Sequence, residues 1–534
     1  MSIHLIIAPI VLPLLVAALQ LVIGERRRRT VATLSVVSCI ALVGVAVALL
    51  LAASQQGDGA AMTAVYRLGD WPARFGIVLV LDRLSALMLL LTAVLALAVL
   101  PYALAPWRHR GGHFQPLSQF LLMGLNGAFL TGDLFNLFVF FEVLLAASYG
   151  LALHGSGPRR VSAGLHYIAV NLTASMLFLI GVSLIFGVTG TLNMAALAEL
   201  IPRVPARTRA LLHAGAALLG VAFLVKAAMW PLGFWLPRTY AASTPAVAAM
   251  FALMTKVGIY VLLRLSLLLF GDGAGPASSH FGSGWMLWGG VATVAAGIVG
   301  LLGARDLGKL AGYNVAISAG TLLGAIALHQ AAVTAGALAY LVISTLGIGA
   351  FFLVAGLLAS DGDEDTDDTL SLEPYDPGGV DSRSDALFAA EDESRVVLSA
   401  PVAILGVCFF ACAILLAGLP PLSGFLAKFA MLAPMLDAPQ PGARVLFTLI
   451  VVAGFCTVIA LCRAGIQIFW AEPERTFAQV RVGEIGSVLL LLGLCLLLTV
   501  MVEAPLHYLG DAARQIHAPA SYIHDVLPAA QVAP

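Results

Sequence analysis

Four lysines are the residues with the clearest chemical potential, because lysine is rare in this chain. Of 28 basic side chains, only four are lysine, namely Lys226, Lys256, Lys309 and Lys428. All except Lys309 fall within long apolar segments, where a charge is costly. Arginine stays protonated at any relevant pH, whereas the pKa of a buried lysine can fall by several units. Lysine is thus found mainly where burial can lower its pKa. This placement predicts that these side chains gain and lose protons.

One carboxylate occupies a similar position. Glu142 ends the phenylalanine-rich run Leu134–Glu142 and is the only carboxylate well inside a predicted span. The alternative to a proton-handling role is a structural ion pair with Lys226. Inserting each charge into a membrane costs about 2.5–3.5 kcal/mol. This cost is larger than the stabilisation that such an ion pair usually provides. The cost therefore favours proton handling.

Two of the buried lysines lie beside a predicted break in a helix. Lys226 comes just before Met229–Gly233, which contains one proline, and Lys428 comes just after Gly418–Gly424, which contains two. Proline removes a backbone donor, so both spans should break within the membrane. Such breaks are tolerated only where the backbone is buried or lines water. Corresponding breaks in two halves are typical of inverted repeats with sites at their interface.

Other polar residues near or within the spans receive weaker interpretations. His166 could relay protons or be a hydrogen-bonded structural histidine. Six further residues are interpreted as helix caps or interface anchors: Asp82, Arg83, Asp133, His213, Arg264 and Arg463.

The composition is that of a protein whose solvent is largely the lipid bilayer. Hydrophobic residues make up 60% of the chain and charged residues only 11%, whereas soluble domains carry about 25% charged residues. The net charge of −1 gives no reason to expect a nucleic-acid partner. The six cysteines lie in apolar runs; Cys408 and Cys412 share a helix face, but no third ligand completes a metal set. We expect neither a metal nor another cofactor.

Apolar segments of about 20 residues predict roughly fourteen membrane-spanning helices in an all-α bundle with two inverted repeats. Spans 4–8 and 9–13 would form the repeats, each with a broken helix. The expected parts are spans 1–3 in 1–112, the first repeat in 113–271, the second in 284–470, and the last span and outer tail in 484–534.

Arginine placement predicts the orientation. Basic residues gather in alternate connections, at Arg26–Arg29, Arg108 and Arg110, Arg159 and Arg160, Arg305 and Lys309, and Arg475. The positive-inside rule makes this side the cytoplasm and places both termini outside. The connection that contains Arg203, Arg207 and Arg209 is an exception, because it lies on the predicted outer side. The acidic stretch 360–395, with thirteen Asp or Glu residues, is expected to be a solvated cytoplasmic loop.

The chain resembles the antiporter-like family shared by Mrp-type (Pha, Mnh) cation/proton antiporters and the proton-pumping membrane subunits of respiratory complex I. The resemblance covers roughly spans three to thirteen. It rests on the Leu134–Glu142 run, Lys226 before Trp230–Pro231, Phe234–Pro237, Thr255–Gly258, and Gly418–Phe425 with Lys428. The sequence of Tyr240–Pro245 and Met254–Lys256 is most similar to that of the D-type subunits of the Mrp group.

The resemblance implies that Glu142 and Lys226 form the first charge pair of a proton path, that Lys256 links the halves, and that Lys428 is the distal carrier. It also implies a place in the bacterial cytoplasmic (inner) membrane and other antiporter subunits as partners, with exchange of H⁺ for Na⁺ or K⁺. Many relatives have a His or Lys in span eleven, but in this chain the corresponding segment Tyr340–Gly349 contains neither. Water held by Ser344 and Thr345 would have to replace that basic group.

Three other interpretations compete. A proton-pumping complex I subunit would use the same membrane residues. A catalytic membrane oxidoreductase would need haem ligands, cysteine clusters or nucleotide motifs, and we find none in the sequence. In a passive scaffold, the charges would only lock helices together.

Overall fold

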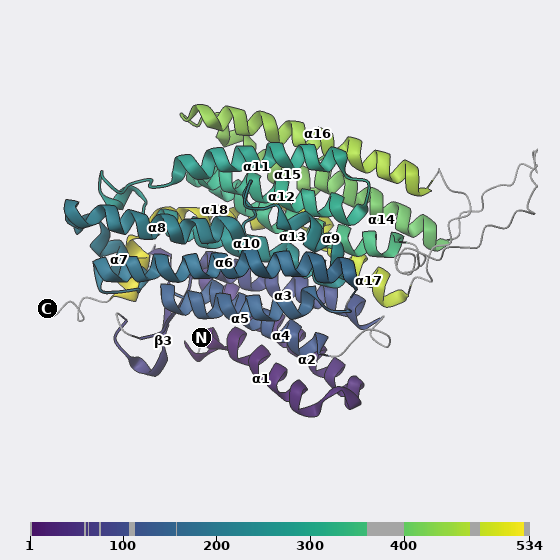
Figure 1. Ribbon diagram of the computed structural model, residues 1–534, viewed down its shortest axis with the longest axis horizontal. Helices are drawn as coiled ribbons and strands as arrows, with labels where there is room; N and C mark the ends of the chain where they lie inside the picture. Colours follow the sequence, from purple (N-terminus) through teal and green to yellow (C-terminus); the bar gives the residue numbers. More distant parts are fainter. Residues whose placement is uncertain are drawn as a thin grey trace, which may run out of the picture.

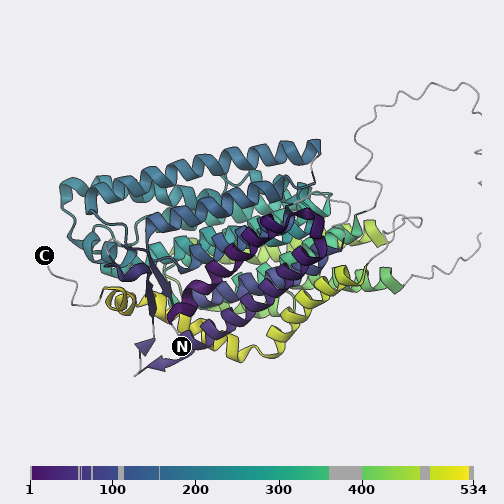
Figure 2. The same ribbon diagram turned by 90° about the horizontal axis from the view of Figure 1, so that it is seen from below.

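The computed structural model describes residues 3–57, 60–61, 63–73, 76–105, 113–155, 157–359, 400–469 and 481–527. Its helices lie roughly parallel along the long axis of the molecule (Figures 1 and 2). Two of the predicted features, the acidic stretch 360–395 and the arginines at 108, 110 and 475, lie outside the described residues.

The first half of the bundle contains α1 to α10. Their bounds are α1 Ala8–Ile23, α2 Arg28–Ser54, α3 Arg83–Leu104, α4 Phe114–Leu130, α5 Leu134–Ala152, α6 Pro158–Thr189, α7 Met194–Leu200, α8 Ala206–Lys226, α9 Trp235–Ala242 and α10 Pro245–Leu268.

The second half contains α11 to α19. Their bounds are α11 Ser283–Gly303, α12 Leu307–Ile326, α13 Ala331–Leu358, α14 Ala400–Ala417, α15 Ser423–Met435, α16 Pro441–Phe469, α17 Val482–Val500, α18 Glu503–His517 and α19 Ala520–Val526.

The number of spans agrees with the sequence pattern. In the described part of the chain, 11 helices are long and apolar enough to cross a membrane. With α4, α12 and the interrupted α14–α15 segment, they account for the fourteen expected spans. The bundle is therefore all-α, as predicted.

Both predicted helix breaks are present. The first separates α8 from α9, and the second separates α14 from α15. In each repeat, the first two helices pack together, as α4–α5 and α11–α12, and the third packs against the broken segment, as α6–α8 and α13–α15. Five spans separate equivalent helices, so the repeats run in opposite directions through the bundle.

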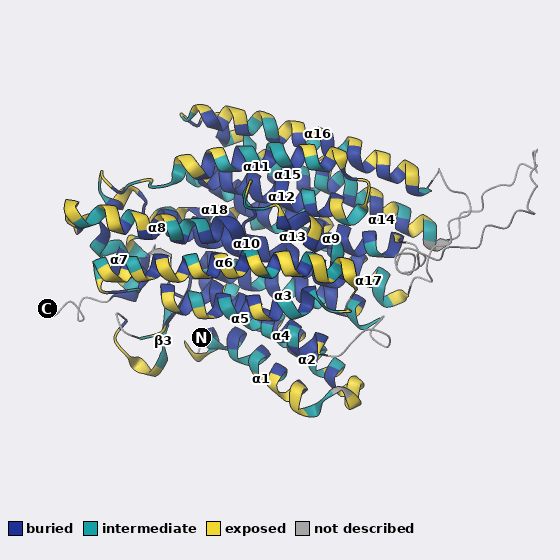
Figure 3. Cartoon of the chain, viewed as in Figure 1, coloured by how far each residue is buried: buried dark blue, intermediate teal, exposed yellow. Residues whose placement is uncertain are grey.

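Two helices form the centre of the protein. All residues of α10 from Ala246 to Leu268 are buried, and α13 is nearly as completely covered. The surrounding helices α6, α11 and α16 show exposed outer faces in Figure 3. These faces carry large apolar side chains, such as Leu165, Val299 and Phe455, which suit lipid or another membrane subunit.

Span three begins later than the sequence pattern predicted. Residues Val78–Leu81 form strand β4, which pairs with β3 (Ala64–Arg67), and α3 begins only at Arg83. A second, two-residue pair joins β1 (Gln56–Gly57) and β2 (Ala60–Ala61). Asp82 stops the strand and starts the helix, because its side chain accepts a hydrogen bond from the Ser85 amide in a capping box.

The C-terminal tail contains an element that the apolar pattern could not indicate. Helix α18 is amphipathic and packs its buried face on α13, α3 and α10. Arg83 ties it down through an ion pair with Asp511 at 2.7 Å. The C-terminal segment is therefore part of the bundle and not only a tail.

Candidate proton-transfer site

The three lysines in apolar segments lie on three different parts of the bundle. Lys226 is the last residue of α8 and is 1% exposed, Lys256 lies midway along α10 and is 0% exposed, and Lys428 is half-buried in α15. Lys309 is exposed at the start of α12. Burial thus separates the same three lysines from the fourth as the sequence did.

The Lys226 ammonium is enclosed by aromatic rings and one amide. Its Nζ lies 3.5 Å from Oδ1 of Asn171 and 5.4 and 5.7 Å from the ring centres of Phe141 and Tyr167. Helix α8 ends at this residue because Ala228 adopts a left-handed conformation (φ 56°) and the Met229 amide turns back to the carbonyl of Leu224. The partial negative charge of a helix C-terminus favours a cation there.

Glu142 lies near Lys226 without forming a direct ion pair. Its Oε1 accepts a hydrogen bond from Ser175 of α6. Among the described residues, Glu142 and Lys226 are not among the oppositely charged groups within 4.0 Å. Phe141 and Asn171 contact the ammonium instead. The expected charge pair is therefore not a direct ion pair, although its two residues lie on α5 and α8, which both pack against α6.

Lys256 starts a chain of hydroxyl groups. Its Nζ donates to Oγ of Ser318 on α12 at 2.7 Å, and this Oγ donates to Oγ of Ser344 on α13 at 3.0 Å. Ser344 was expected here, but Ser318 was missed because a serine in an apolar helix has no distinctive signal. Thr345 does not take part: its hydroxyl donates to the carbonyl of Leu341 on its own helix at 2.6 Å.

Lys428 is held by the broken backbone of the second repeat. Its Nζ donates to the carbonyls of Leu416 at 3.1 Å and Ala417 at 2.8 Å, the last two residues of α14. The next residue, Gly418, has φ +78°, and a Cβ there would lie 2.6 Å from Cδ of Lys428. Glycine is needed both for this turn and for the lysine to reach the carbonyls.

Lys226 and Lys428 both belong to a broken helix, but their ammonium groups have different partners. Lys226 is the last residue of α8, and Asn171 contacts its ammonium, whereas Lys428 reaches back from α15 to the carbonyls at the C-terminus of α14. The partial negative charge of a helix C-terminus favours a cation at both places. The sequence predicted the breaks beside the lysines. It did not indicate that backbone oxygens, and not carboxylates, contact Lys428.

Arginines fill the structural ion pairs instead. Arg264 pairs with Asp82 at 2.8 Å, and Arg83 pairs with Asp511. Burial alone would raise the pKa of Asp82, but the Arg264 guanidinium and the hydrogen bonds from Arg264 and Ser85 outweigh it and hold that pKa below its usual value. These residues anchor the helix ends, as predicted.

The other candidate residues do not join the lysines. Asp133 caps α5 through the amides of Phe135 and Asn136, and burial raises its pKa against these hydrogen bonds. The His166 ring is exposed and contacts the carbonyl of Ser162 on its own helix. This contact fits the alternative of a hydrogen-bonded histidine, and the relay role stays a prediction.

A helical membrane bundle with two broken helices and buried, unpaired lysines belongs to the class of ion-translocating membrane proteins. Residues 131–458 match the family model described as NADH:quinone oxidoreductase/Mrp antiporter, TM. The chain is 50% identical to the D-type subunit of a probable K⁺/H⁺ antiporter of Rhizobium meliloti (strain 1021), over 98% of both chains.

Two further comparisons cover nearly the whole chain. The D-type subunit of the Na⁺/H⁺ antiporter of Alkalihalophilus pseudofirmus is 33% identical over 98% of this chain and 99% of the relative. A chain in the structure of the Mrp complex from Dietzia sp. DQ12-45-1b matches with a TM-score of 0.80 and 27% identity, over 99% of this chain and 100% of that one. This protein belongs to the transmembrane family shared by NADH:quinone oxidoreductases and Mrp antiporters.

Proposed function

We propose that this chain is the D-type, proton-translocating subunit of a multisubunit Na⁺(K⁺)/H⁺ antiporter. It is a transporter subunit that works with the other subunits of its complex in the bacterial cytoplasmic membrane. Protons pass along Glu142, Lys226, Lys256 and Lys428 in exchange for a monovalent cation. The full-length likeness to two D-type antiporter subunits supports this proposal over a role in a complex I-like pump.

The observation that carries the proposal is the kind of atom that contacts each lysine. Asn171 contacts Lys226, Ser318 contacts Lys256, and two backbone carbonyls contact Lys428. All these partners are neutral, so the lysine can lose its proton without leaving a carboxylate buried and uncompensated. A scaffold that only locked helices would be expected to use close ion pairs, as Arg264 and Asp82 do.

The helix packing supports a continuous order for the transfer steps. Glu142 and Lys226 lie on α5 and α8, which are bridged by α6, and α8 packs against α10, which carries Lys256. Ser318 and Ser344 extend from Lys256 to α13, and α13 packs against α15, which carries Lys428. Water would complete the steps that exceed hydrogen-bond distance.

Lys226→Ala tests the proposal. The variant should lose cation/proton exchange in vesicles that contain the whole complex, because the first lysine carrier is missing, while the complex still assembles. Lys309→Ala is the matched control, since Lys309 is exposed, and should exchange normally. Assembled Lys226→Ala complexes with normal exchange would refute the proton path. Proton pumping driven by NADH oxidation would instead favour the complex I-like alternative.

A further inference from the structure

A cluster of titratable side chains lies apart from the lysines, at the end of the bundle where α12 and α13 join. It consists of His280 and Asp272 between α10 and α11, His329 between α12 and α13, and His517 at the end of α18. We call this set the histidine cluster. The rings of His280 and His329 meet edge to face with centres 4.6 Å apart, and Nε2 of His280 lies 3.0 Å from the Asp272 carboxylate.

The cluster is connected to the surface. A cavity of about 350 Å³ is lined by Asp272, His280, His329 and Gln440, among others. The Asp272 side chain is 95% exposed and that of His280 42% exposed, whereas both ring nitrogens of His329 are buried without a hydrogen-bond partner. A path of increasing burial therefore runs from water to Asp272, then His280, then His329.

His329 is held in an unusual conformation. Its φ is +53° and that of His280 is +55°, a region in which non-glycine residues are strained. Burial first, then the neighbouring His280 and His517, lower the pKa of His329 to about 4, against the opposing effect of Asp272. Its ring is thus neutral at physiological pH, with one N–H and one free nitrogen.

Polar groups also extend toward the cluster from Lys256. Ser318 contacts this lysine, and Thr321, which is also buried, follows one turn later on the same side of α12. From Ser318 to the end of α12 at Ile326 the helix runs for about 12 Å, and His329 follows three residues later. At the cluster, Oγ1 of Thr334 lies 2.9 Å from Nε2 of His517.

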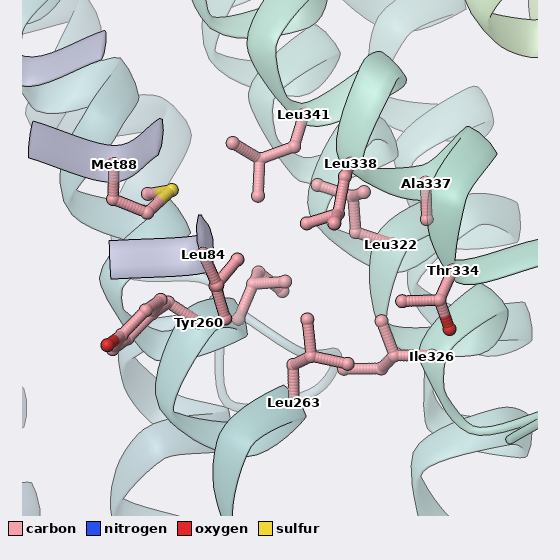
Figure 4. Close-up of a pocket in the computed structure, with 11 residues that line it drawn as sticks. Leu84, Met88, Tyr260, Leu263, Leu322, Ile326, Thr334, Ala337, Leu338 and Leu341 are labelled. Carbon is pink, nitrogen blue, oxygen red and sulfur yellow. The ribbon is translucent and has the colours of Figure 1, made fainter. Parts of the chain in front are cut away.

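An apolar constriction separates the two ends of this route. A cavity of about 10 Å³ is lined mainly by leucines of α3, α10, α12 and α13, with Thr334 at its edge (Figure 4). That volume is at the lower limit for one water molecule. The hydroxyl of Tyr260 points away from the cavity and bonds to the carbonyl of Phe129. The constriction is therefore too small for a continuous chain of water molecules in this conformation.

We propose that the histidine cluster is a proton-exchange port, through which protons pass between Lys256 and the water at the end of the bundle that carries both termini. The port rests on the proposed function of the lysine path. In one transfer, the free ring nitrogen of His329 accepts a proton from one side, and the original N–H gives its proton to the other side. The ring ends neutral, in its other tautomer, and no other reactant is needed. The leucine-lined constriction prevents a permanent leak and must become hydrated during turnover.

His329→Asn tests the port. Asparagine tolerates the left-handed backbone conformation but cannot carry a proton between two ring nitrogens. The variant should slow exchange by about tenfold or more in vesicles with the assembled complex, and should increase the solvent isotope effect in D₂O. Added imidazole should restore part of the rate, because the open cavity can admit it.

The matched control is His113→Asn. His113 is also left-handed (φ 70°), but it is exposed at the start of α4, so its substitution should change neither rate nor isotope effect. Imidazole also weakens a pH gradient, and this control corrects for that effect. The port is refuted if His329→Asn exchanges normally while Lys226→Ala is inactive, or if a slow variant keeps the normal isotope effect and gains nothing from imidazole. If Lys226→Ala also exchanges normally, the proposed function itself is wrong.

Discussion

Replacing Lys428 by arginine separates a proton carrier from a fixed charge. The present ammonium donates to the carbonyls of Leu416 and Ala417 at 3.1 and 2.8 Å. A guanidinium has five N–H donors and can keep both bonds, each worth about 1.5–3 kcal/mol because the donor is charged. Assembly should therefore survive in Lys428→Arg, whereas Lys428→Met, which loses both bonds, should assemble less well.

Proton release should not survive in Lys428→Arg. Free arginine has a pKa about 2–3 units above that of free lysine. In the same surroundings, deprotonation of the arginine would therefore cost about 3–4 kcal/mol more than deprotonation of the lysine. Exchange should fall by about 10²–10³-fold.

The assay is the cation/proton exchange rate against pH in vesicles, with the amount of assembled complex measured separately. Because Gly418 lies against the lysine stem, the thermal stability of the complex must also be compared, so that a steric defect is recognised. Near-normal exchange in a stable Lys428→Arg complex would contradict the reasoning and leave Lys428 as a fixed charge.

Two further predictions concern groups that contact the central helices. Ser318→Ala should slow exchange about tenfold or more, since Lys256 loses a hydrogen bond worth about 1.5–3 kcal/mol, whereas Ser318→Thr should stay close to normal; equal rates in both would exclude the serine from the path. Asp82→Asn should destabilise the complex by about 3–5 kcal/mol, because Arg264 is left buried and unpaired. The pKa of Asp82 is lowered in the fold, so its stabilising effect is present above the pKa of a free aspartate, about 3.9. It is lost as the pH falls through the lowered value. Thermal unfolding of the solubilised complex between neutral and acidic pH should show this loss in the parent protein and not in Asp82→Asn.

Much of the site could be predicted because charge in an apolar segment is conspicuous. Lys226, Lys256, Lys428 and Glu142 all stand out in this way, and the structure buries Lys226 and Lys256 fully and Lys428 in part. Their roles in proton transfer remain predictions. Ser318 could not be found from the sequence, because a serine in a helix usually bonds to its own backbone and only the approach of α10 gives it Lys256 as a partner.

The histidine cluster was missed for a related reason. His280, His329 and His517 lie far apart in the sequence, in connections and at a helix end, where single histidines are ordinary surface residues. Only the packing of α18 on α13 and the turns after α10 and α12 place them together.

The sequence by itself determined that this protein lies in the lipid bilayer, where its spans lie and where two of its helices break. It also showed that the basic residues inside apolar segments are mostly lysine, whereas arginine predominates elsewhere. These features follow from local composition, because about 20 apolar residues must form a helix in lipid and proline must interrupt one. Tertiary structure decided the partners of each charge. It separated Glu142 from Lys226, gave Lys256 a chain of hydroxyl groups, and turned the end of α14 toward Lys428. Except for the turn between α14 and α15, such contacts join residues from distant segments at a spacing of a few ångströms. That spacing depends on how whole helices pack, which no local pattern encodes.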